Sequence, residues 1–225
     1  MATPVSSDPV TASSGRTGRL PRSARRRQLL TAAQEVFVAN GYHAAAMDDI
    51  ADRAGVSKPV LYQHFPGKLD LYLALIDQHT EALVNHVTQA LAGTTDNKIR
   101  VHLATKAYFD FVDGEGEAFR LVFESDLRNE PAVRERVERA SQLCMEAIAD
   151  TIGHDTGVSR ERAELLAIGL TGASEIAARY WLNANRSVPK EEAIALLSTL
   201  LWRGISDFPL EREADGSRPE NSAER

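Results

Sequence analysis

The side chains best suited to chemistry lie between residues 57 and 68, where donors and cations alternate with apolar residues. Ser57 and Lys58 fall at a predicted helix start, where free N–H groups and the helix dipole favour an anion. Lys58 can reach a phosphate or a guanine edge, and the apolar Pro59 and Val60 suit a thymine methyl. Further donors suited to phosphate are Tyr62, His64, Lys68, Arg22, Arg25 and Arg26. The set predicts a helix that contacts DNA, although exposed polar residues without any partner would show the same pattern.

Two short helices must position these side chains. The first is predicted over 47–54 and the second over 57–65, with Gly55 allowing the positive φ of a tight turn between them. A preceding helix is predicted over 23–40, ended by Gly41. The apolar residues expected to pack the two short helices against it are Ile50, Ala54, Val56, Leu61 and Phe65. The arrangement is that of a helix-turn-helix.

The continuous run from Met47 to Phe65, together with Gly41 and Tyr42, resembles the TetR family of transcriptional regulators. The resemblance implies DNA contacts at Ser57, Lys58, Tyr62, His64 and Lys68, and dimerisation through the last two helices. The chain departs from the family pattern at two places. It has Ala45 and Ala46 where members usually carry Ser or Thr, and Pro59 where they commonly carry Gly.

The remaining pattern predicts an all-α protein with two domains. A three-helix helix-turn-helix DNA-binding domain is expected over 21–68, and a larger helical domain for ligand binding and dimerisation over 69–208. Disordered tails are expected at 1–20 and 209–225. The later helices are predicted over 69–91, 97–112, 117–127, 131–152, 159–185 and 189–202.

The stretch 97–127 is rich in aromatic residues, which line either a ligand cavity or an ordinary core. Residues one helical turn apart could present apolar surface to an acyl chain. The predicted cavity residues are Leu103, Ala107, Phe111, Phe119 and Phe123.

The last two helices are apolar on more than one face, which predicts burial on two sides. Either they form a twofold interface with a second copy, or they are buried within a monomer. The predicted interface residues are Gly172, Ile176, Tyr180, Leu197, Leu200 and Leu201. A homodimer would set two recognition helices on a pseudo-palindromic operator in double-stranded DNA.

A narrower resemblance, over 41–45, 57–65, 94–97, 119–124 and 178–182, is to family members that regulate fatty-acid synthesis genes. It implies a long-chain acyl-CoA effector that releases DNA. Two alternatives stay open. The protein could be a repressor that responds to another hydrophobic small molecule, controlling efflux or catabolic genes, or a helical lipid carrier that does not bind DNA.

Composition and motifs narrow the classes of function that remain. The net charge of −6 hides a basic segment at 1–68, with 9 Lys and Arg against 5 Asp and Glu, and an acidic remainder. Cys144 is the single cysteine, so no internal disulfide can form. The spacing of the six His residues indicates no metal site, and no nucleophile or phosphate-loop motif indicates an enzyme or a cofactor. Because the lone cysteine can form no internal disulfide, a reducing cytoplasm is the expected location. No apolar run reaches the roughly 18 residues of a membrane helix, so no membrane span is expected.

Overall fold

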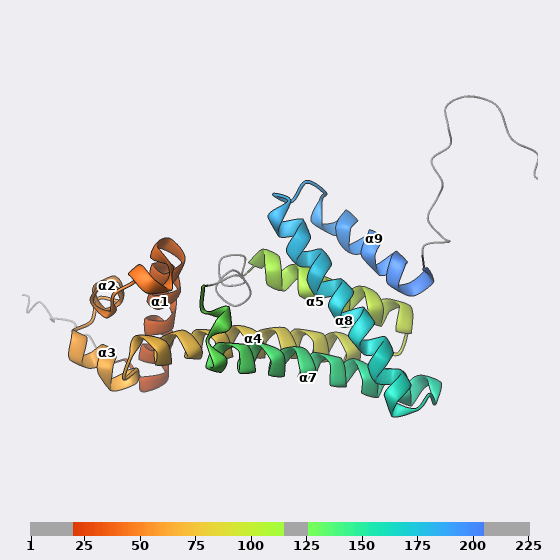
Figure 1. Cartoon of the computed structure of the whole chain (residues 1–225), viewed down its shortest axis with the longest axis horizontal. Helices are drawn as coiled ribbons and strands as arrows, with labels where there is room; N and C mark the ends of the chain where they lie inside the picture. Colours follow the sequence, from red (N-terminus) through yellow and green to blue (C-terminus); the bar gives the residue numbers. More distant parts are fainter. Residues whose placement is uncertain (1–19, 115–125, 205–225) are drawn as a thin grey trace, which may run out of the picture.

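The computed structural model describes residues 20–114 and 126–204, and these residues are helical without any strand. The predicted all-α fold class is therefore confirmed. The labels follow Figure 1, which shows α1–α3 at one end of the molecule and α5, α8 and α9 at the other. The helices are α1 (Arg22–Ala44), α2 (Met47–Arg53), α3 (Lys58–His64), α4 (Lys68–Ala92), α5 (Asn97–Gly114), α7 (Pro131–Thr156), α8 (Arg160–Asn183), α9 (Lys190–Arg203) and a 3-10 turn η1 (Asp126–Asn129).

Helices α1, α2 and α3 pack their apolar faces against one another at one end of a continuous core. Leu29, Phe37, Ile50, Leu61 and Phe65 are at most 2% exposed, as the apolar spacing of the sequence predicts for the last three. Burial of such side chains contributes about 1.5–3 kcal/mol each, which is the main force that holds two helices of seven residues in place.

Glycines set the two turns of this core. Gly41 has φ 73° and kinks α1, after which the helix continues for one short turn. Gly55 has φ 63° and follows α2. Its N–H donates to the carbonyl of Asp52, and the N–H of Val56 donates to that of Ala51, which is the Schellman arrangement of a helix end.

Helix α4 joins the two parts of the molecule. Its 25 residues span about 37 Å, from α1 to the larger helical body (Figure 1). In that body α4 packs on α5 and α7, α8 packs on α7 and α5, and α9 lies mainly on α5. No helix among the described residues is long and apolar enough to cross a membrane.

The predicted helix ranges agree with the structure within a few residues, with two exceptions. Helix α7 continues to Thr156, where Gly157 with φ 71° ends it, because the residues after 152 remain compatible with a helix until that glycine. The helix predicted over 117–127 lies almost wholly outside the described residues, as do the two predicted tails.

Candidate DNA interface and ligand cavity

The outer face of α3 carries most of the predicted DNA contacts. Ser57, Lys58, Pro59 and Tyr62 are exposed, whereas Val60 is half-buried. Ser57 occupies the N-cap position, but its side chain makes no capping hydrogen bond. Pro59 lies in the first turn, where its missing N–H leaves no helical hydrogen bond unmade.

Lys58 is held by an acidic partner in the free protein. Its Nζ donates to Oδ2 of Asp48 in the first turn of α2, and this hydrogen bond raises the pKa of the Lys58 ammonium. A DNA phosphate or base must therefore replace Asp48. The sequence pattern did not single out Asp48, because ten residues of chain separate it from Lys58.

A cluster of arginines from α1 lies beside the end of α3. Burial and then the charges of Arg22, Arg26 and Arg25 lower the pKa of half-buried His64. The Arg26 guanidinium lies 4.4 Å from the Phe65 ring centroid. The predicted arginines and His64 thus share one basic surface with α3.

The start of α2 has a substitute for the missing Ser or Thr cap. Ala46 is the N-cap residue, and its backbone N–H donates to Oδ2 of Asp49 over 3.3 Å. Half of a capping box is therefore present without a capping hydroxyl.

Lys68 has a different role from the predicted DNA contact. Its Nζ donates to the carbonyls of Tyr42, His43 and Ala45 over 2.8, 3.2 and 2.9 Å, and lies 4.5 Å from the Tyr42 ring centroid. An ammonium group has three donors, and three carbonyls use them. Lys68 fixes the start of α4 to the α1–α2 turn, so we remove it from the set of DNA contacts.

The larger domain contains a cavity of about 570 Å³ between α5, α7, α8 and the end of α9. This volume lies within the roughly 300–1,000 Å³ typical of small-molecule sites. The wall is mainly apolar, formed by Leu91, Val101, Ala104, Ile148, Ile152, Leu165, Leu166, Leu170, Leu201 and Trp202. Leu165 and Leu166 are also 72% and 52% exposed, so the cavity reaches the surface beside the start of α8.

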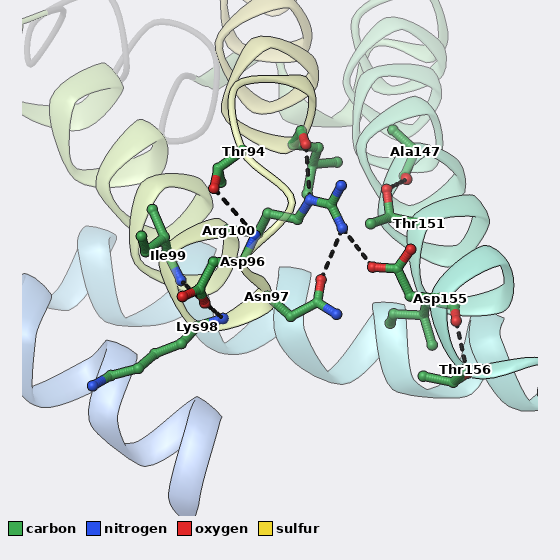
Figure 2. Close-up of polar contacts among 12 residues, drawn as sticks. Thr94, Asp96, Asn97, Lys98, Ile99, Arg100, Ala147, Thr151, Asp155 and Thr156 are labelled. Carbon is green, nitrogen blue, oxygen red and sulfur yellow. Dashed lines mark hydrogen bonds and ion pairs between the residues drawn. The ribbon is translucent and has the colours of Figure 1, made fainter.

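One end of this cavity is polar. Figure 2 shows Arg100 donating to Oδ1 of Asn97 and to the Asp155 carboxylate. The Arg100 guanidinium also donates to the Leu91 carbonyl. A hydrogen bond from Asn97 and the charge of Arg100 lower the pKa of Asp155. Arg100 therefore ties the end of α4 to α5 and α7 at the cavity wall.

The predicted cavity residues are wrong for α5. Leu103, Ala107 and Phe111 do not line the cavity, and Ala107 and Phe111 are 7% and 3% exposed core residues. The cavity meets the other face of α5, through residues such as Val101, Ala104 and Tyr108. Both faces of this helix are apolar, so spacing alone did not identify the right one. Phe119 and Phe123 lie outside the described residues.

Helices α8 and α9 expose apolar side chains that a lone subunit leaves in water. Ile176 and Tyr180 are 59% and 73% exposed, and Leu200 is 39% exposed. Two of the other predicted interface residues lie elsewhere, because Leu197 is half-buried against the core and Leu201 lines the cavity. Gly172 is half-buried on α8. Further exposed apolar residues on these helices are Leu165, Leu166, Ile168, Leu196 and Trp202.

Comparison with known proteins decides the family. Residues 29–75 match the family described as bacterial regulatory proteins, tetR family. The HTH-type transcriptional activator FasR of Mycolicibacterium smegmatis is 50% identical over 197 residues, which cover 88% of this chain and 90% of that protein. The chain belongs to the TetR family. As a TetR family member it is a helix-turn-helix DNA-binding transcriptional regulator and not an enzyme, as the sequence predicts.

Solved structures agree with the fold of this TetR family regulator. A TetR-like regulator from Rhodococcus sp. RHA1 has a TM-score of 0.62 at 27% identity, covering 84% of this chain and 100% of that one. FadR from Bacillus subtilis, solved in complex with stearoyl-CoA, has a TM-score of 0.67 at 20% identity, covering 80% of this chain and 98% of that one.

Proposed function

We propose that this protein is a homodimeric regulator of fatty-acid synthesis genes, and that a long-chain acyl-CoA lowers its affinity for a pseudo-palindromic operator. The observation that carries the proposal is the apolar cavity of about 570 Å³ with a polar end at Arg100. The 50% identity to the activator FasR and the stearoyl-CoA bound to the similarly folded FadR support an acyl-CoA as the occupant.

Apolar and polar residues of the cavity wall would bind different parts of the ligand. Val101, Ala104 and Ile152 supply apolar contact to an acyl chain. Arg100 offers a cation where the chain would end in its polar head, although the ligand must compete with Asp155 for it. No protein cofactor or metal ion is needed for this chemistry.

Helix α4 connects the cavity to the DNA-binding helices. Its Leu91 carbonyl accepts a hydrogen bond from Arg100, and its Lys68 donates to the turn between α1 and α2. A ligand that shifts Arg100 acts on one end of a rigid helix whose other end holds the helix-turn-helix. The effect on DNA requires that the ligand bind more tightly to the form with misplaced recognition helices.

The test is an operator-binding titration with hexadecanoyl-CoA, on wild type and on Ala104→Trp. We expect the ligand to release DNA from wild type, and Ala104→Trp to bind DNA but ignore the ligand because the indole fills the cavity. Thr88→Trp on the exposed side of α4 is the matched control and should respond normally. Equal release from Ala104→Trp, or an acyl-CoA affinity unchanged by operator DNA, contradicts the proposal.

A further inference from the structure

Three buried hydroxyl groups line the end of the cavity that lies away from Arg100. Thr105, Tyr108 and Ser174 are 1%, 3% and 4% exposed, and all three belong to the cavity wall. Within the described residues, the hydroxyl oxygens of Thr105 and Tyr108 are buried and make no hydrogen bond of normal distance and angle. The Tyr108 hydroxyl lies near Cys144 and Thr171, which interact with it closely enough to affect its pKa. Leaving a buried hydroxyl unpaired is unfavourable, so these two groups point to a partner that enters the cavity.

Two other threonine hydroxyls in this domain donate to carbonyls of their own helices. Thr151 lines the same cavity, and its hydroxyl donates to the Ala147 carbonyl over 2.9 Å (Figure 2). Thr80 on α4 donates to the Ile76 carbonyl over 2.8 Å. Among the described residues, the buried hydroxyls without such a hydrogen bond are those of Thr105, Tyr108 and Thr171, and only Thr105 and Tyr108 line the cavity. We define the inner end of the cavity by Thr105, Tyr108 and Ser174.

The surroundings of the inner end favour a neutral ligand atom. Burial raises the pKa of Tyr108 above its usual range, and burial raises that of the neighbouring Cys144 thiol to about 11, so both stay uncharged at neutral pH. Glu175 adds a negative charge close to both groups. A carboxylate or phosphate there would meet repulsion and no cation among the three residues of the inner end, whereas a hydroxyl or carbonyl oxygen can pair with the two hydroxyls.

The inner end and the polar end are separated by apolar wall. Along α5, Thr105 and Tyr108 lie about 8 Å and about 12 Å from Arg100, with Val101 and Ala104 between. We propose that the inner end recognises a hydroxyl or carbonyl oxygen carried on the acyl chain, through the hydroxyls of Thr105 and Tyr108. The preferred effector is then an oxygenated acyl thioester and not a plain saturated one. This inference rests on the proposed function and names its ligand more narrowly.

The test compares hexadecanoyl-CoA with its 10-hydroxy, 12-hydroxy and 16-hydroxy derivatives in direct binding measurements. We expect at least one hydroxylated probe to bind wild type about fivefold more tightly than hexadecanoyl-CoA, as one added neutral hydrogen bond allows. Tyr108→Phe and Thr105→Val should lose the preference, so that each hydroxylated probe binds them no more tightly than hexadecanoyl-CoA does. Thr151→Val is the matched control and should keep it, because its hydroxyl already has a partner.

The outcomes separate this inference from the proposed function. If hexadecanoyl-CoA binds and releases DNA but no hydroxylated probe is preferred, the inference is overturned and the proposed function stands. A preference that persists in both Tyr108→Phe and Thr105→Val also overturns it. If none of the four thioesters binds, both fail. Thermal unfolding of each variant shows whether it is folded, and loss of an unpaired hydroxyl should leave the melting temperature near that of wild type.

Discussion

At the scale of single residues, His64 makes DNA binding depend on pH. Burial and the neighbouring arginines hold its pKa below the usual 6.5 in the free protein. Phosphates that neutralise these arginines will raise that pKa, so the complex binds protons that the free protein does not. Operator affinity should therefore rise as the pH falls from 7.5 to 6, measured by fluorescence anisotropy at fixed salt. His64→Gln should flatten the profile, and an equal slope in that variant would show that another group titrates.

The lowered pKa of His64 also makes the stability of the free protein depend on pH. A histidine whose folded pKa is depressed is more easily protonated in the unfolded chain. The free energy of unfolding should then decrease as the pH falls below about 6.5, towards the lower pKa of folded His64. His64→Gln should remove part of that decrease in denaturant titrations.

Lys58 is the residue most suited to base recognition. It is exposed at the start of α3, where only Asp48 holds it among the described residues. Lys58→Ala should cost about 1–3 kcal/mol on operator DNA and less on random DNA if the ammonium contacts a base edge. Competition titrations with both DNAs measure the difference. An equal loss of affinity for operator and random DNA would show that Lys58 contacts a phosphate and not a base.

Residue types and short spacings predict such exposed positions well but not their partners. Lys58 at a helix start and Gly55 in the turn follow from local pattern. The role of Lys68 does not, since its acceptors are carbonyls 23–26 residues earlier in the chain. A lysine that could contact phosphate can equally bind backbone, and only the tertiary fold decides between them.

At the scale of elements, α4 is fixed at both ends by cations bound to carbonyls. Lys68→Met keeps the length of the side chain but removes three hydrogen bonds to the α1–α2 turn. We expect a loss of about 1–2 kcal/mol in stability and weaker DNA binding, with the salt dependence of binding unchanged because no phosphate contact is lost. Hexadecanoyl-CoA should release DNA less effectively from this variant.

Arg22 provides the control for Lys68, because Arg22 is still predicted to contact a phosphate. Arg22→Ala should reduce the log–log salt slope of the dimer by about 1.8, for two phosphates. Salt titrations of both variants against operator DNA separate the roles. A reduced slope in Lys68→Met would return that residue to the DNA contacts.

Helix positions were predictable here, whereas helix faces were not. The apolar periodicity, with glycine and proline residues near the helix ends, predicts the bounds of α4, α8 and α9 to within a few residues. In α5, Ala107 and Phe111 face the core and Ala104 and Tyr108 face the cavity, yet both pairs are apolar and one turn apart. Which face meets a cavity depends on how α8 packs, and its contacts with α5 join residues distant in sequence.

At the scale of the whole molecule, charge and exposed apolar surface lie at opposite ends. The basic surface belongs to α1 and α3, and most of the exposed large apolar side chains belong to α8 and α9. Figure 1 shows these two groups of helices at opposite ends of the molecule. Four cations per subunit, Lys58, Arg22, Arg25 and Arg26, would give a dimer a log–log salt slope near −7. This value leaves out Lys68, whose ammonium is already bound.

Substitutions on the exposed face of α8 give the most direct test of dimerisation. Ile176 and Tyr180 are one helical turn apart and 59% and 73% exposed, so a charge there costs a single subunit little. In an interface the same charge would be buried without a partner, at a cost of several kcal/mol. Ile176→Glu with Tyr180→Glu should therefore yield a folded monomer in sedimentation equilibrium, while Thr88→Glu on α4 stays dimeric.

The DNA affinity of that monomer follows from the same argument. One subunit contacts one half-site, so operator binding should weaken by more than about a hundredfold and the salt slope should halve to near −3.5. The halved slope distinguishes lost dimerisation from damage to the helix-turn-helix, which would lower affinity on each half-site separately. A double variant that remains dimeric with the full slope would place the interface away from α8.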